Sequence, residues 1–271
     1  MGSIPDNATA SGPSPLQPIR DFLGVVGEAV ANLNTAVVGL DAVENGYDKP
    51  DTLDISWNPK DRAFAARKSR RFVLESVLVR VAEALHEYTQ AVTRLPRYHS
   101  IRDTWNKDTS GADKLFDIAT HAFGQDRYVI SGAVLLIHWR NRVVHPKSRA
   151  ALTHKQKITM LEAAAEIEHN YAGLSVERLL RDFEEGKPTL KDISSIIAMS
   201  IRLVREMGHS FDKISQEDLD SLLKYYELDN KIHAIYRATA ADKQQESIIR
   251  LLQSEAPGLV LAYRRLYQNV E

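Results

Sequence analysis

The stretch RFVLESVLVRVAEALHEYTQAV, residues 71–92, is the clearest indication of the fold class. Its apolar side chains recur at spacings of four, four, four and three residues, at Val73, Val77, Val81, Leu85 and Tyr88. At about 100° per residue these positions form one stripe along a helix. Pro96 cannot continue a helix, so the pattern predicts a helix over about residues 62–95.

The flanking sequence also reads as helices, separated by Gly, Pro and Asn. We expect earlier and later helices over residues 16–43, 110–123, 128–145, 153–173, 175–185, 189–207, 215–228, and from 229 to the C-terminus with a break near Pro257. No alternation typical of strands is long enough to compete. The sequence therefore predicts an all-α fold, a helical bundle with additional C-terminal helices.

We expect three parts: a disordered tail at residues 1–15, a bundle at 16–174 and a C-terminal helical extension at 175–271. The tail is rich in Gly, Ser, Pro and Asn. No apolar run approaches the roughly 20 residues of a membrane span, and no charged start precedes an apolar block. These features, with the absence of cysteine, favour a cytoplasmic protein that does not contact a membrane.

Charge and composition exclude several classes of protein. The chain of 271 residues has 35 Lys and Arg against 36 Asp and Glu, a net charge of -1, so it is not a globally basic nucleic-acid binder. The lack of cysteine excludes disulfides, thiolate metal sites and a cysteine nucleophile. No phosphate-binding glycine loop, dinucleotide fingerprint or nucleophile elbow occurs, and we expect no cofactor and no metal.

One helix end carries the residues suited to chemistry, HWRNRVVHP at residues 138–146. Arg140 falls within an apolar arc, where a guanidinium needs a carboxylate, a partner subunit or an anion. His145 ends the helix because Pro146 follows. An imidazole that moves protons near neutral pH, a fixed cation and the amide of Asn141 together suit phosphodiester chemistry.

This helix end resembles the signature of the HEPN superfamily, Arg-Asn-x-x-x-His, with Arg140, Asn141 and His145 in the matching positions. Four other Arg-to-His pairs have similar spacing, but only Arg140 is followed by Asn. The resemblance implies a metal-independent endoribonuclease that works as a homodimer, with a role as a toxin or in antiviral defence and an antitoxin or other protein as a possible regulator. The implied RNA products carry a 2′,3′-cyclic phosphate and a 5′-hydroxyl.

The resemblance also implies a role for each residue. His145 would transfer the proton as an RNA 2′-hydroxyl attacks, Arg140 would stabilise the phosphate, and Asn141 would orient the site. An ideal helix sets Arg140 and His145 about 140° apart, which favours a site built from two subunits. Further contacts to RNA are expected from a rim of nearby residues, His138, Arg142, Lys147 and Arg149.

Other interpretations remain open. Arg140 paired to an internal carboxylate would be purely structural, and the protein would then be a non-catalytic dimerisation, RNA-binding or sensor module. Three Glu-x-x-His sequences begin at Glu83, Glu166 and Glu206. Two such sequences, with two further carboxylates, are typical of a helical bundle that binds two iron ions. The first two pairs lie opposite the apolar stripes of their helices, so they do not point into a core. The helical spacing of Tyr263 and Tyr267 indicates a core or interface.

Overall fold

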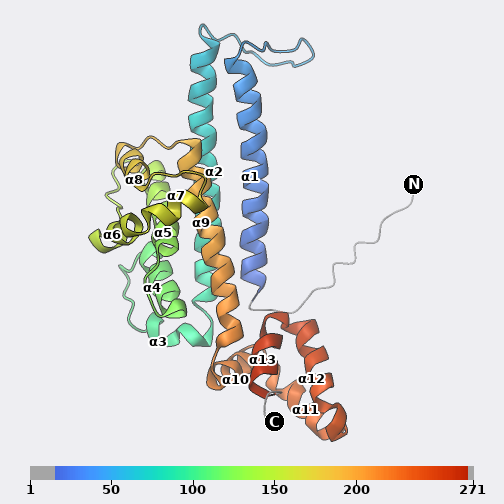
Figure 1. Cartoon of the computed structure of the whole chain (residues 1–271). Helices are drawn as coiled ribbons and strands as arrows, with labels where there is room; N and C mark the ends of the chain where they lie inside the picture. The colour runs from blue at the N-terminus through green and yellow to red at the C-terminus, as the bar shows by residue number, and fades with distance from the viewer. Residues whose placement is uncertain (1–15, 268–271) are drawn as a thin grey trace, which may run out of the picture. The chain divides into compact units, whose positions relative to one another are not determined.

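The computed structural model describes residues 16–267, and in this range the chain contains helices and no strand (Figure 1). The α-helices are α1 (Gln17–Glu44), α2 (Arg62–Val92), α3 (His99–Arg102), α4 (Gly111–Phe123), α5 (Tyr128–Val144), α6 (His154–Glu162), α7 (Ala164–Asn170), α8 (Val176–Glu185), α9 (Leu190–His209), α10 (Gln216–Tyr225), α11 (Asp229–Ala238), α12 (Ala241–Glu255) and α13 (Val260–Tyr267). The prediction of an all-α fold is confirmed, while the expected tail at residues 1–15 lies outside the described residues.

Helix ends marked by strong local signals lie where the sequence predicts them. Ser110 caps α4, since its side chain accepts from the Asp113 N–H and the Asp113 carboxylate accepts from the Ser110 N–H. Gly124 ends α4 in the left-handed conformation, with φ of 69°. These ends were predictable because the caps are made by residues three or fewer positions away.

Two expected helices are each divided in two. The helix predicted over residues 153–173 is broken at Ala163, and the helix predicted from residue 229 is broken between Ala238 and Ala241. Both predictions are wrong at these points. Neither break contains a Gly or a Pro, so nothing local in the sequence marks it. On either side of Ala163, Met160 and Ile167 are both fully buried, so both segments face the core.

The described chain forms two compact units. One comprises residues 21–90 and 106–204, and the other comprises residues 16–20, 91–105 and 205–267. The boundary that we expected at residue 175 falls inside the first unit. In that unit α1 and α2 run antiparallel, because Phe22 lies against Tyr88 near one end and Glu44 pairs with Arg67 near the other.

The core of the first unit is built around α5. Ten consecutive residues from Tyr128 to Ile137, and then Trp139, are buried. Gly132 allows close packing with α9, because a Cβ at this position would collide with the side chain of Met199. A helix buried on all sides holds its C-terminal end in a fixed place, and this end carries the predicted site.

The second unit has its own apolar core. The short 3-10 helix at Pro96–Tyr98 packs against α10, and Tyr98 is fully buried there. Arg97 joins the same unit through a hydrogen bond from Nη1 to Ser210 Oγ at 3.1 Å. Core side chains from the later helices are Leu219, Leu222, Leu252, Leu259 and Tyr263.

Helix α1 is long and apolar enough to cross a membrane by length and composition. Its most apolar 18-residue window has a mean hydropathy of 1.4, and 17% of that window is buried. The sequence predicted this helix over residues 16–43 but not its overall apolar character, because Gly, Glu, Asn and Thr divide its apolar residues into short runs. Core helices of soluble proteins and signal sequences meet the same criterion, so this feature is weak evidence for a membrane.

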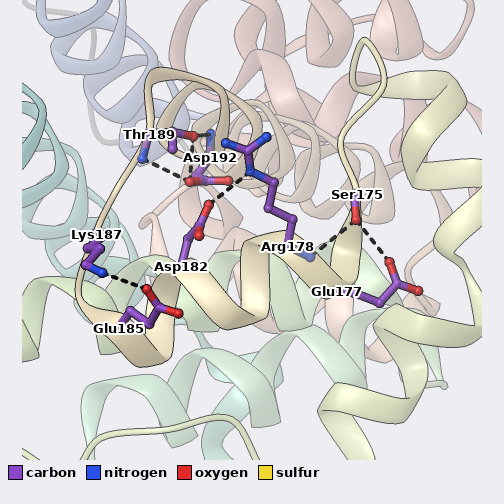
Figure 2. Close-up of polar contacts among 8 residues, drawn as sticks. All are labelled: Ser175, Glu177, Arg178, Asp182, Glu185, Lys187, Thr189 and Asp192. Carbon is purple, nitrogen blue, oxygen red and sulfur yellow. Dashed lines mark hydrogen bonds and ion pairs between the residues drawn. The ribbon is translucent and has the colours of Figure 1, made fainter.

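Polar contacts fix α8 and the start of α9 (Figure 2). Ser175 caps α8 by accepting from the Arg178 N–H. The Asp192 carboxylate accepts from both the backbone N–H and the hydroxyl of Thr189, at 2.9 and 2.6 Å. Burial raises the pKa of Asp192 even though it accepts these bonds. The contacts matter for the site because α8 supplies two residues that hold the end of α5.

Candidate functional site

The end of α5 is held in place by packing. Trp139 is 1% exposed and lies edge-on against Phe183 of α8, with ring centroids 5.5 Å apart. An aromatic pair of this geometry adds to the stabilisation that burial provides. The residues next to Trp139 in sequence, including Arg140 and Asn141, therefore have fixed backbone positions.

The helix ends as predicted, before Pro146. His145 is the C-cap residue, with φ of −123° and ψ of 89°, and its N–H donates to the Asn141 carbonyl at 2.9 Å. The His145 carbonyl in turn accepts from the Ser148 N–H at 2.7 Å. The backbone around His145 is thus tied into a turn while its side chain is exposed. An exposed imidazole on a fixed backbone can meet a ligand that approaches from solvent.

Arg140 is paired with a carboxylate of the same chain. Its guanidinium forms an ion pair with Glu83 of α2, and Nη1 donates to Asn141 Oδ1 at 3.1 Å. The Nε of Arg140 is buried and has no hydrogen-bond partner among residues 16–267. The sequence predicted that this cation needs a partner, and in the single chain that partner is Glu83.

Arg140 and Asn141 line an open pocket of about 170 Å³ between α2, α4 and α5. Its other lining residues include Glu83, His86 and Gly111. Gly111 leaves room for the imidazole, because a Cβ there would lie 2.9 Å from His86 Nδ1. His145 does not line this pocket. The structure thus brings together two of the three signature residues and leaves the third on the exposed turn.

His86 is a site residue that sequence reasoning did not assign. In the sequence it belongs to one of the Glu-x-x-His sequences and to one of the four other Arg-to-His pairs, Arg80 to His86. In the structure its Nε2 lies 2.7 Å from Gln90 Nε2, and its ring borders the pocket beside Arg140. The signal that could have found it is its position three residues after Glu83, which places both side chains on one helix face.

Arg142, expected in an RNA-binding rim, is engaged within the chain. Its Nε donates to the Ala150 carbonyl at 2.8 Å, Nη1 donates to the Phe183 carbonyl at 3.2 Å, and Nη2 pairs with Glu184 at 3.0 Å. Its guanidinium lies 3.9 Å from the centroid of the Phe183 ring. Burial alone would raise the pKa of Glu184, but hydrogen bonds from Arg142 and Lys157 lower it. Arg142 therefore joins α5 to α8.

The other three expected rim residues differ in exposure. Lys147 and Arg149 are exposed on the segment after α5, close in sequence to His145. His138 is partly buried, and its Nδ1 has no hydrogen-bond partner among residues 16–267. Burial, opposed by the nearby Asp113, lowers the pKa of His138. Lys147 and Arg149 can therefore meet a phosphate directly, whereas His138 is neutral near pH 7.

The Glu-x-x-His sequences do not form a metal site in the described part of the chain. Within residues 16–267 no group of three or more His, Asp or Glu side chains is arranged to hold a metal ion. Glu83 pairs with Arg140, and Glu166 accepts a hydrogen bond from the Tyr128 hydroxyl at 2.8 Å. These contacts account for both carboxylates without a metal.

Comparison with known proteins gives no relative from which a function could be carried over. No protein-family model, no curated protein and no solved structure matches the chain.

Proposed function

We propose that this protein is a metal-independent endoribonuclease of HEPN type that cleaves RNA by attack of a 2′-hydroxyl on the adjacent phosphate. The observation that carries the proposal is the end of α5, where Arg140 and Asn141 border a pocket and the exposed His145 caps the helix five residues later. A fixed cation, an amide and an imidazole are the groups that this reaction needs.

In this reaction the 2′-oxygen forms a bond to phosphorus and the bond from phosphorus to the 5′-oxygen breaks. The 2′-hydroxyl loses a proton and the departing 5′-oxygen gains one. An imidazole suits both transfers near neutral pH. Arg140 would hold the phosphate oxygens as charge develops on them, and Lys147 and Arg149 would contact flanking phosphates.

The placement of the residues favours a site shared between two copies of the chain. Arg140 lines the pocket between α2, α4 and α5, whereas His145 lies on the exposed turn and does not line that pocket. A two-fold dimer that brings two α5 ends together would place the His145 of one copy opposite the Arg140 of the other. Each of the two shared sites would then hold one imidazole, which takes the proton from the 2′-hydroxyl and delivers it to the departing 5′-oxygen.

The alternative is a non-catalytic helical module for dimerisation, RNA binding or sensing. The ion pair between Arg140 and Glu83 favours it, because a structural arginine needs such a partner. The two proposals differ in one outcome, which is whether RNA is cut.

The test is incubation with total RNA in EDTA, using the wild type, His145→Ala and His169→Ala. His169 is an exposed histidine in the last turn of α7, so it controls for the loss of an exposed imidazole elsewhere. The nuclease proposal expects fragments from the wild type and His169→Ala and none from His145→Ala. Intact RNA in all three samples, with and without EDTA, would support the non-catalytic module. Cleavage that occurs without EDTA and is lost in EDTA would contradict a metal-independent reaction.

A further inference from the structure

A second pocket lies in the unit that contains α10 to α13, and the proposed nuclease site does not involve it. This tyrosine pocket has a volume of about 330 Å³, and its lining residues are Asp220, Leu223, Asp229, Ile232, His233, Tyr236, Tyr263 and Tyr267. Its side chains come from α10, α11 and α13. Pockets that bind small molecules are typically apolar concavities with a few placed polar groups.

The walls of the tyrosine pocket are apolar and aromatic. The rings of Tyr263 and Tyr267 have centroids 4.8 Å apart and an angle of 33° between their planes. The hydroxyls of Tyr236 and Tyr263 lie 3.4 Å apart. Tyr263 is 2% exposed and Tyr236 is 43% exposed, so the wall runs from the core to the solvent. Such a surface can hold an aliphatic chain against ring faces.

Besides the tyrosine hydroxyls, the polar groups of the tyrosine pocket are the carboxylates of Asp220 and Asp229 and the imidazole of His233. Asp220 accepts from the Tyr267 hydroxyl at 2.7 Å, and Asp229 lies in the first turn of α11. Burial and then this hydrogen bond raise the pKa of Tyr267 to about 12, so its hydroxyl stays a donor at neutral pH.

Two nearby cations are engaged elsewhere. Lys231 is held by Glu255 of α12, with Nζ 2.7 Å from Oε1, and Arg265 donates to the Ile214 carbonyl. Neither of these cations therefore pairs with Asp220 or Asp229. A cation from solution is the ligand that these two carboxylates would attract.

We propose that the tyrosine pocket binds an aliphatic polyamine, with the chain along the tyrosine rings and ammonium groups at Asp220 and Asp229. Tyrosine faces attract cations through their quadrupole, and carboxylates add direct ion pairs. The two carboxylates match a ligand with more than one positive charge. This binding site is independent of RNA cleavage at α5.

The test is calorimetric titration of the full chain with spermidine, and with 1,8-octanediol as an uncharged chain of the same length. We expect saturable binding of one spermidine per chain and none of the diol. Asp220→Asn should weaken spermidine binding about fivefold, because one ion pair is lost while an oxygen remains for Tyr267. Asp242→Asn, which removes an exposed carboxylate outside the pocket, should leave the affinity unchanged.

A second variant keeps the test valid if Asp220→Asn fails to fold. Tyr236→Leu removes a half-exposed ring and should also weaken binding about fivefold, with circular dichroism to confirm the fold. No saturable heat with spermidine at millimolar concentration would overturn the proposal. Equal binding of the diol, or an equal loss in Asp242→Asn and Asp220→Asn, would overturn it as well.

Discussion

Replacing Arg142 with alanine should destabilise the fold rather than weaken RNA binding alone. Arg142 donates to two backbone carbonyls, those of Ala150 and Phe183, and its guanidinium stacks on the Phe183 ring. Each hydrogen bond contributes about 1 kcal/mol and the stacking about 0.5–1 kcal/mol. The ion pair with the half-exposed Glu184 adds a few tenths. Together these contacts predict a loss of about 3 kcal/mol.

The assay is urea denaturation followed by circular dichroism, with Lys147→Ala as the matched control. Lys147 is an exposed cation five residues further along the chain, and its loss should change the free energy of unfolding by less than about 0.5 kcal/mol. The opposite result would be that Arg142→Ala is as stable as Lys147→Ala while both variants lose RNA affinity to the same extent. Arg142 would then be part of an RNA-binding rim and not a tie to α8.

Three further predictions concern the rest of α5 and its partners. Glu83→Gln removes the carboxylate that pairs with Arg140 and leaves this cation for a phosphate. RNA affinity in EDTA, measured by fluorescence anisotropy, should therefore rise about fivefold. A lower affinity would mean that Glu83 positions the arginine. Because the pKa of His138 is lowered in the folded protein, unfolding takes up a proton, and the free energy of unfolding should fall as the pH drops below about 6.5. Denaturation series at several pH values should show that His138→Asn removes this part of the pH dependence. Equal slopes of the free energy of unfolding against pH in the wild type and His138→Asn would contradict this. Mixing Arg140→Ala with His145→Ala, each inactive alone, should restore about one quarter of wild-type cleavage, because half of the randomly formed dimers are mixed and one of the two shared sites in each is intact. No recovery would mean that both residues act in a site within one chain.

Local signals in the sequence were enough for much of the fold. The caps of α4 and the end of α5 before Pro146 involve neighbours a few residues apart, and both were predicted. The break at Ala163 could not be predicted because no Gly or Pro marks it. The division of the chain into two units depends on which distant segments pack together, and no local pattern encodes that.

The candidate site, like the fold, was predictable where it depends on local sequence and not where it depends on contacts between distant residues. The sequence identified Arg140 as a cation in need of a partner, but Glu83 as that partner depends on the packing of α2 against α5. The engagement of Arg142 likewise depends on Phe183, which is 41 residues away in the sequence. A helical wheel predicts which residues share a face, whereas the contacts across that face come from the tertiary structure.

If this chain cleaves RNA through the 2′-hydroxyl next to the broken bond, removal of that hydroxyl must prevent the cut. The measurement compares, in EDTA, a short RNA whose cut site has been mapped with the same strand carrying one 2′-deoxy nucleotide on the 5′ side of that bond. We expect the all-ribose strand to be cut to a 2′,3′-cyclic phosphate end and the substituted bond to stay intact. Cleavage of the substituted bond, or products ending in a 3′-hydroxyl and a 5′-phosphate, would contradict it.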